Sequence, residues 1–163
     1  MKQKSTWLLK LAVVLMAIPP LALTGLLWFE IGKTAYKEAA NGATLGYIIL
    51  GILFLITVSL IPYLAALSQS FKLLHYIDVS KAFSELSVAA LKKIKKSALV
   101  ISGIYVLALP LVAMVAEWDD APGLIIIGMM PIFAAVVISI FAAVLERLLK
   151  EAIEIKTENE LTV

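Results

Sequence analysis

The sequence predicts an all-α integral membrane protein, a four-helix bundle in which each helix crosses the bilayer. Of its 163 residues, 62% are hydrophobic, and the mean hydropathy is +1.00. A soluble domain is usually only ~45–50% apolar, so this chain has more apolar surface than its own polar residues can cover in water. Four long stretches also lack Asp, Glu, Lys, Arg and His. These observations favour a single multi-pass membrane domain over residues 1–163.

Four segments are long enough to cross a membrane. A helix rises ~1.5 Å per residue, so a hydrocarbon core of ~30 Å needs ~20 apolar residues. The predicted spans are residues 11–29, 45–67, 98–116 and 123–145. Their apolar residues run continuously, unlike the alternating pattern of membrane strands. The first span exceeds the ~7–15 apolar residues of a secretory signal and no clear cleavage site follows it, so we expect an uncleaved helix.

The positive charges are unevenly distributed about these spans. Lysine and arginine accumulate on the cytoplasmic side of membrane proteins. With both chain ends inside, the inner side holds twelve of the fourteen, and only Lys33 and Lys37 lie outside. The sequence therefore predicts a protein of the bacterial cytoplasmic (cell) membrane. Both termini, the loop of residues 68–97 and the tail of residues 146–163 are expected in the cytoplasm.

Every predicted span contains proline, and none contains an acidic, basic or histidine side chain. Proline removes one helical hydrogen bond, but neighbouring helices can satisfy the freed carbonyl. Ordinary kinked packing is the favoured interpretation, and a hinge or binding cavity is the alternative. Proton-coupled transport lacks its usual carriers. A facilitator built from the polar residues of the spans stays open; these are Thr24, Thr57, Ser59, Tyr63, Ser102 and Tyr105.

The fourth span carries small residues at helical spacing, which let helices approach closely in lipid. This stripe predicts packing against another helix of the chain, with a homo-oligomer contact as the alternative. The tail then continues with charges four residues apart. The pairs Glu146–Lys150 and Arg147–Glu151 predict a helix that runs out of the membrane.

The loop of residues 68–97 contains a helical amphipathic pattern between residues 79 and 96. Phe83, Leu86 and Ile94 fall on one face of a helix. Four lysines fall on the opposite face or its flank: Lys92, Lys93, Lys95 and Lys96. We expect a cytoplasmic amphipathic helix between spans two and three. It would lie on anionic lipid headgroups or against a protein partner, or serve only as a topology signal.

No motif for catalysis or for cofactor binding is visible. The chain has no cysteine and a single histidine, His75, which argues against a Cys- or His-based metal site. The acids Glu117, Asp119 and Asp120 favour a solvated outer turn over a weak cation site. The net charge of +2 is too small to indicate direct nucleic-acid binding. We therefore expect no enzyme activity, no metal and no cofactor.

Three segments carry a resemblance to a known family. They are KAFSELSVAALKKIKKSA at residues 81–98, AEWDDAPGLIIIG at 116–128 and EIKTENELTV at 154–163. They resemble the YoaS-like family, small bacterial four-helix membrane proteins catalogued as a domain of unknown function. The resemblance implies a bacterial membrane protein and carries no catalytic residues. Genes of that family often neighbour one for a small helix-turn-helix regulator, which implies a candidate cytoplasmic partner.

Three functional hypotheses follow, of which a membrane enzyme is disfavoured because no nucleophile–base pair or metal cluster is visible. The leading one is a membrane-bound interaction or regulatory protein with a cytoplasmic partner. The alternative is a small transporter or channel component that acts as an oligomer. The position of the polar side chains separates them, because a facilitator needs polar groups that converge on one cavity at mid-depth.

Overall fold

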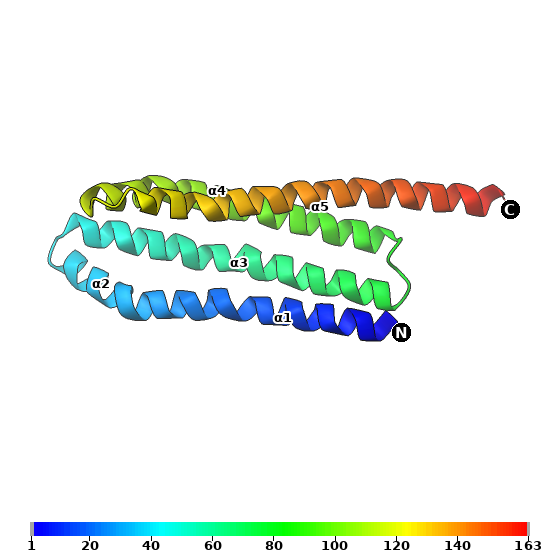
Figure 1. Cartoon of the computed structure of the whole chain (residues 1–163), viewed down its shortest axis with the longest axis horizontal. Helices are drawn as coiled ribbons and strands as arrows, with labels where there is room; N and C mark the ends of the chain where they lie inside the picture. The colour runs from blue at the N-terminus through cyan, green and yellow to red at the C-terminus, as the bar shows by residue number, and fades with distance from the viewer. Residues whose placement is uncertain (1, 163) are drawn as a thin grey trace.

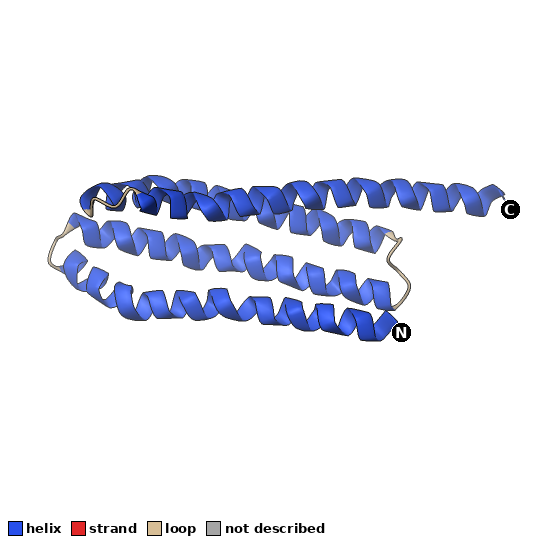
Figure 2. Ribbon diagram, in the orientation of Figure 1, coloured by secondary structure: helices blue, strands red, loops and turns tan. Residues whose placement is uncertain are grey.

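The computed structural model describes residues 2–162, which form helices joined by short loops (Figures 1 and 2). No strand occurs within these residues. The elements are α1 (Lys2–Leu27), the π-helix η1 (Trp28–Gly32), α2 (Lys33–Ala40), α3 (Thr44–Asp78), α4 (Glu85–Trp118) and α5 (Gly123–Thr162). The predicted all-α class is confirmed.

Four helical stretches are long and apolar enough to cross a membrane, which confirms the predicted number. The first runs from Thr6 to Ala40 and includes α1, η1 and α2, and the others are α3, α4 and α5. All the prolines of the predicted spans lie inside these helices: Pro19, Pro20, Pro62, Pro110 and Pro131.

The polar segment between the second and third predicted spans is divided between the ends of two long helices and a short loop. No separate amphipathic helix over residues 79–96 is seen in the described chain. Residues 79–84 form a loop, and residues 85–96 are the first turns of α4. No glycine or proline occurs between Glu85 and Gly103, so helical hydrogen bonding continues from the polar start into the apolar segment. Similarly, α3 continues to Asp78, beyond the predicted span.

The helices pack in series rather than as a closed bundle. α1 packs on α3, α3 on α4, and α4 on α5, whereas the described backbones of α1 and α5 do not approach each other. The N-terminus, the α3–α4 loop and the C-terminus lie toward one end of the molecule, and α5 projects beyond the other helices there (Figure 1). This end carries most of the lysines. We call it the charged end; its cytoplasmic location stays a prediction.

The other end is closed by α2, which packs against the start of α3. Ala35 and Ala39 of α2 are buried, as is Gly46 of α3. A Cβ atom on Gly46 would lie 2.5 Å from the Ala39 nitrogen and 2.6 Å from the Ala35 carbonyl oxygen. The two helices therefore meet at backbone contact, a distance that only glycine allows.

Candidate functional site

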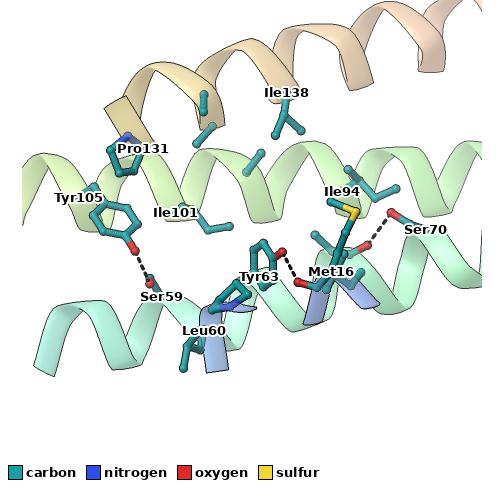
Figure 3. A pocket seen from close by; sticks show the side chains of 16 residues that line it. Met16, Ser59, Leu60, Tyr63, Ser70, Ile94, Ile101, Tyr105, Pro131 and Ile138 are labelled. Carbon is teal, nitrogen blue, oxygen red and sulfur yellow. Dashed lines mark hydrogen bonds between the residues drawn. The ribbon is translucent and has the colours of Figure 1, made fainter. Parts of the chain in front are cut away.

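All four long helices line a cavity of about 390 Å³ (Figure 3). Its wall includes Met16 of α1, Tyr63 of α3, Ile101 of α4 and Ile138 of α5. Small side chains leave this space open; the lining alanines are Ala66, Ala98, Ala134 and Ala135. A volume of ~300–1,000 Å³ is typical of small-molecule sites, so the cavity is large enough to hold a ligand.

The hydroxyl groups in this wall already have partners within the protein. Ser59 Oγ donates to a carbonyl of its own helix at 2.6 Å and lies 3.0 Å from Tyr105 Oη. The Tyr63 hydroxyl donates to the Met16 carbonyl at 2.7 Å, and Ser70 Oγ donates within α3 at 2.9 Å. Figure 3 shows these contacts around an otherwise apolar space. The cavity therefore presents little polar chemistry to a solute.

The other three polar residues considered for a facilitator do not line this cavity. Thr24 Oγ1 donates to the Pro20 carbonyl at 2.7 Å, and Ser102 Oγ donates to a carbonyl of α4 at 2.8 Å. Thr57 Oγ1 donates within α3 at 2.8 Å and accepts a 2.7 Å bond from Trp28 Nε1. Each polar group thus satisfies the helix backbone or joins two helices.

The Tyr63–Met16 bond repairs the helix break that a proline causes. Pro20 has no N–H, so the carbonyl of Met16, four residues earlier, loses its helical donor. The Tyr63 hydroxyl, from the neighbouring helix α3, donates to this carbonyl. Neighbouring helices commonly satisfy freed carbonyls in this way within membranes. The proline therefore couples α1 to α3.

A double-mutant cycle tests this coupling. Tyr63→Phe should lower the free energy of unfolding by about 1 kcal/mol, because it leaves the Met16 carbonyl without a donor. In a Pro20→Ala background the same change should cost almost nothing, since an amide N–H at position 20 restores the helical bond. Unfolding in mixed detergent micelles measures both values. The control is Tyr47→Phe at an exposed position of α3, and an equal cost of Tyr63→Phe in both backgrounds would contradict the coupling.

A second cavity, of about 520 Å³, continues from the first toward the α2 end. It shares Tyr105 and Pro131 with the first cavity, and these residues lie between the two. Its wall is again apolar over most of its length and includes Leu53, Ala108 and Ile127. Residues of all four long helical stretches therefore line two mostly apolar cavities, one in each half of the molecule.

Two interhelical ion-pair clusters hold the charged end. In the first, Asp78 at the end of α3 accepts hydrogen bonds from Lys10 and Thr6 of α1. In the second, the buried Glu146 of α5 accepts from Lys95 of α4 at 2.9 Å, and Lys150 lies 3.4 Å away on its other side. Only 7% of the Glu146 side chain is exposed. The clusters fasten α1 to α3 and α4 to α5.

These contacts favour the charged form of both carboxyl groups, which lie outside the predicted spans. The hydrogen bond from Lys10, helped by that from Thr6, lowers the pKa of Asp78 below its ordinary value. The hydrogen bond from Lys95 is the main cause that lowers the pKa of Glu146, and Lys150 adds to it, while burial opposes both. Both groups are therefore carboxylates at neutral pH.

The lowered pKa of Asp78 predicts a pH-dependent contribution to stability. A carboxyl group whose pKa falls on folding stabilises the fold above its ordinary pKa of ~4, and the contribution is lost as pH falls through the folded value. Wild type should therefore melt at a higher temperature than Asp78→Asn at pH 7, and the gap should narrow at pH 3. The control Asp119→Asn, in the exposed α4–α5 loop, should change little at either pH. An unchanged gap at pH 3 would contradict this cluster.

The residues that the sequence predicts for a partner or membrane surface do not share one environment in the structure. Phe83 and Leu86 are exposed, at 57% and 48%. Ile94 is half-buried and lines the first cavity, and Lys95 is paired with Glu146. The remaining lysines are exposed on α4: Lys92, Lys93 and Lys96.

The acidic residues do not gather into a metal site. Within residues 2–162, no group of three or more His, Cys, Asp or Glu side chains is arranged to hold a metal ion. This includes the acids at and after the end of α4, Glu117, Asp119 and Asp120. The predicted helix pairs of the tail are confirmed, since Lys150 contacts Glu146 at 3.4 Å and Arg147 contacts Glu151 at 3.6 Å.

Comparisons with known proteins identify the family of the chain. A family profile described as "Protein of unknown function (DUF2975)" matches residues 33–163. The chain is 50% identical over 163 residues, the full length of both proteins, to the "Uncharacterized membrane protein YoaS" of Bacillus subtilis (strain 168). No solved structure matches the chain. The resemblance seen in the sequence is thereby confirmed, and the chain belongs to the DUF2975 family of YoaS-like membrane proteins.

Proposed function

We propose that this protein is a cell-membrane protein that presents its charged end, in the cytoplasm, to a soluble regulatory protein. The observation that carries the proposal is the ordered helical structure of that end. There α3 and α4 extend beyond the predicted spans, and α5 projects further still (Figure 1). The Asp78 and Glu146 clusters fix the helices relative to one another. Such an end forms a defined surface, as recognition by a partner requires.

Exposed apolar side chains at this end supply anchors for a partner. Phe83 and Leu86 lie exposed at the α3–α4 connection, and the proposed cytoplasmic orientation of this end places them in water. Exposed apolar groups outside the lipid often mark interaction sites. The exposed lysines Lys92, Lys93 and Lys96 add a basic rim, and interfaces commonly use apolar anchors for affinity and charges for orientation.

The cavity supports the regulatory role over transport of a polar solute. Its hydroxyl groups are already bonded within the protein, and the rest of its wall is apolar. A facilitator would need such groups free to replace the solvation of its substrate. The proposal accordingly assigns the protein no catalytic step and no bound cofactor.

Binding to the regulator that the family resemblance implies tests the proposal. The full chain in lipid nanodiscs is mixed with a purified small helix-turn-helix regulator of the kind whose gene often neighbours those of the family. Wild type should bind, and Phe83→Ala/Leu86→Ala should weaken binding at least tenfold, because losing two anchors costs more than ~1.4 kcal/mol. The control Val106→Ala/Leu107→Ala removes exposed apolar groups of α4 within the predicted span and should bind normally.

Two outcomes would overturn the proposal. One is a wild type that binds neither this regulator nor any other cytoplasmic protein after crosslinking in the native host. The other is equal loss of binding in both double variants. An oligomeric transporter remains the second candidate because all four helices line one cavity. Solute flux into proteoliposomes that is abolished by Ala66→Phe would support it instead.

A further inference from the structure

The first cavity has the dimensions of a single lipid chain. Its wall runs from Ser59 to Ser70 on α3 and from Ile94 to Tyr105 on α4, so at ~1.5 Å per residue each side is roughly 16 Å long. Half of a ~30 Å hydrocarbon core is about 15 Å, the depth that the acyl chains of one leaflet fill. Tyr105 and Pro131, between the two cavities, then lie near the bilayer midplane.

The packing of the helices gives such a chain a route into the cavity. The described backbone of α1 contacts α3 but neither α4 nor α5, and α5 contacts only α4 among the long helices. Yet side chains of α1 and α5 line the same cavity, including Met16 and Pro20 on one side and Ala135 and Ile138 on the other. No backbone contact between α1 and α5 closes this side of the cavity, and the lining residues Met16 and Ile138 are exposed there, so a chain can enter from the lipid.

The chemistry of the wall selects hydrocarbon. Its hydroxyl groups are bonded within the protein, and alanine, leucine, isoleucine, methionine and proline supply the rest of the surface. An apolar cavity that stays empty forfeits dispersion contacts, whereas an acyl chain restores them. A polar ligand would instead lose its own hydrogen bonds there.

The charged end supplies the environment of an anionic headgroup. The cavity ends at Ser70 and Ile94, and exposed lysines lie within about one turn of these residues: Lys72 on α3, and Lys92, Lys93 and Lys96 on α4. Their helical spacing places them off the cavity face, so they make the membrane surface around this end positive rather than line the cavity. Each lysine near an anionic membrane surface contributes about 1 kcal/mol of attraction. Only this end of the cavity has that concentration of positive charge.

From these observations we infer that the first cavity binds one acyl chain of an anionic phospholipid from the inner leaflet. The chain lies between α1 and α5 with its end near Tyr105, and the headgroup lies at the membrane surface of the charged end, where the lysines make the surface positive. This site goes beyond the proposed docking function and does not depend on a protein partner. The bound chain would fill the cavity and contact both α1 and α5, whose backbones do not contact each other.

Two adjacent alanines of α3 provide a matched test. Ala66 lines the cavity, whereas Ala65 is exposed and does not. The full chain is reconstituted in vesicles of phosphatidylglycerol and phosphatidylcholine, extracted in a mild detergent and examined by native mass spectrometry. Wild type and Ala65→Phe should each retain one phosphatidylglycerol per chain. Ala66→Phe should reduce that retained fraction at least tenfold, because the phenyl ring occupies the space of the chain.

A second pair and a photo-crosslink guard against misfolding of one variant. Ile101→Trp fills the cavity from α4, and Val100→Trp adds the same group on the exposed side. A phosphatidylglycerol with a diazirine on its acyl chain should label cavity residues of the detergent-extracted wild type. This labelling should fall in Ile101→Trp and stay unchanged in the matched control Val100→Trp. Retention of no lipid, equal retention in Ala65→Phe and Ala66→Phe, or retention of phosphatidylcholine as readily as phosphatidylglycerol would overturn the inference. So would a dimer that dissociates in Ala66→Phe, since a second copy would then fill the space.

Discussion

Glu146→Ala is expected to lower the free energy of unfolding by about 2–3 kcal/mol. Removing one partner of a fully buried ion pair costs ~3–5 kcal/mol. A smaller loss is expected here because the side chain of the partner Lys95 is 29% exposed. The carboxylate is also the point at which α4 and α5 are joined, since Lys95 and Lys150 both contact it. Detergent unfolding of the reconstituted chain measures the loss.

A double-mutant cycle separates this pair from charge effects in general. The coupling energy between Lys95→Ala and Glu146→Ala should exceed 1 kcal/mol, because the two groups meet in a buried interhelical contact. The pair Arg147–Glu151 is the control on the same helix, with 84% and 56% of its side chains exposed. Its coupling should be about 0.3–0.5 kcal/mol. Equal coupling in the two pairs would show that Glu146 does not clamp the helices.

Gly46→Ala is expected to lower the free energy of unfolding by about 1–3 kcal/mol. The added methyl group would approach the backbone of Ala35 and Ala39 to within 2.6 Å, and a backbone cannot move aside as a side chain can. The helix α2 must therefore shift away from α3. The same unfolding assay detects the loss, and fluorophores on cysteines introduced at Lys37 and Tyr47 should report a longer separation.

Gly103→Ala is the matched control for this prediction. Gly103 lies inside α4, and a Cβ atom there meets nothing within 4 Å. Since glycine is less favourable than alanine inside a helix by ~0.5–1 kcal/mol, stability should stay the same or rise slightly. A similar loss in both variants would mean that the close contact of α2 with α3 is not the cause.

The four long apolar helices were predictable from the sequence, whereas the ends of these helices were not. Charge-free stretches such as residues 98–116 mark where lipid replaces water. They do not mark where a helix starts, because the glutamate, lysine, alanine and leucine residues that precede this stretch are also good helix formers. α4 therefore begins at Glu85, and the expected amphipathic segment became part of it. The π-helix at Trp28–Gly32 likewise has no clear signal in the sequence.

The site was predictable only within single helices. The contact of Glu146 with Lys150 follows from their spacing of four residues, and the structure confirms it. The contact of Glu146 with Lys95 depends on the register of α4 against α5, which spacing along the chain does not give. The same is true of the Tyr63 bond to the carbonyl freed by Pro20, and of the alanines that meet around the cavity.

The charged end is expected to lie in the cytoplasm, and the accessibility of single cysteines tests this location. The chain has no cysteine, so single cysteines report without background. Single cysteines replace Asn41 and Asp119, in the loops at the end opposite the charged end, and Glu85 and Asn159 in the charged end. All four positions are exposed. In intact cells a membrane-impermeant maleimide should label the first two, and the last two should be labelled only after permeabilisation. Labelling of Glu85→Cys or Asn159→Cys from outside intact cells would contradict the topology and, with it, the proposed docking of a cytoplasmic partner.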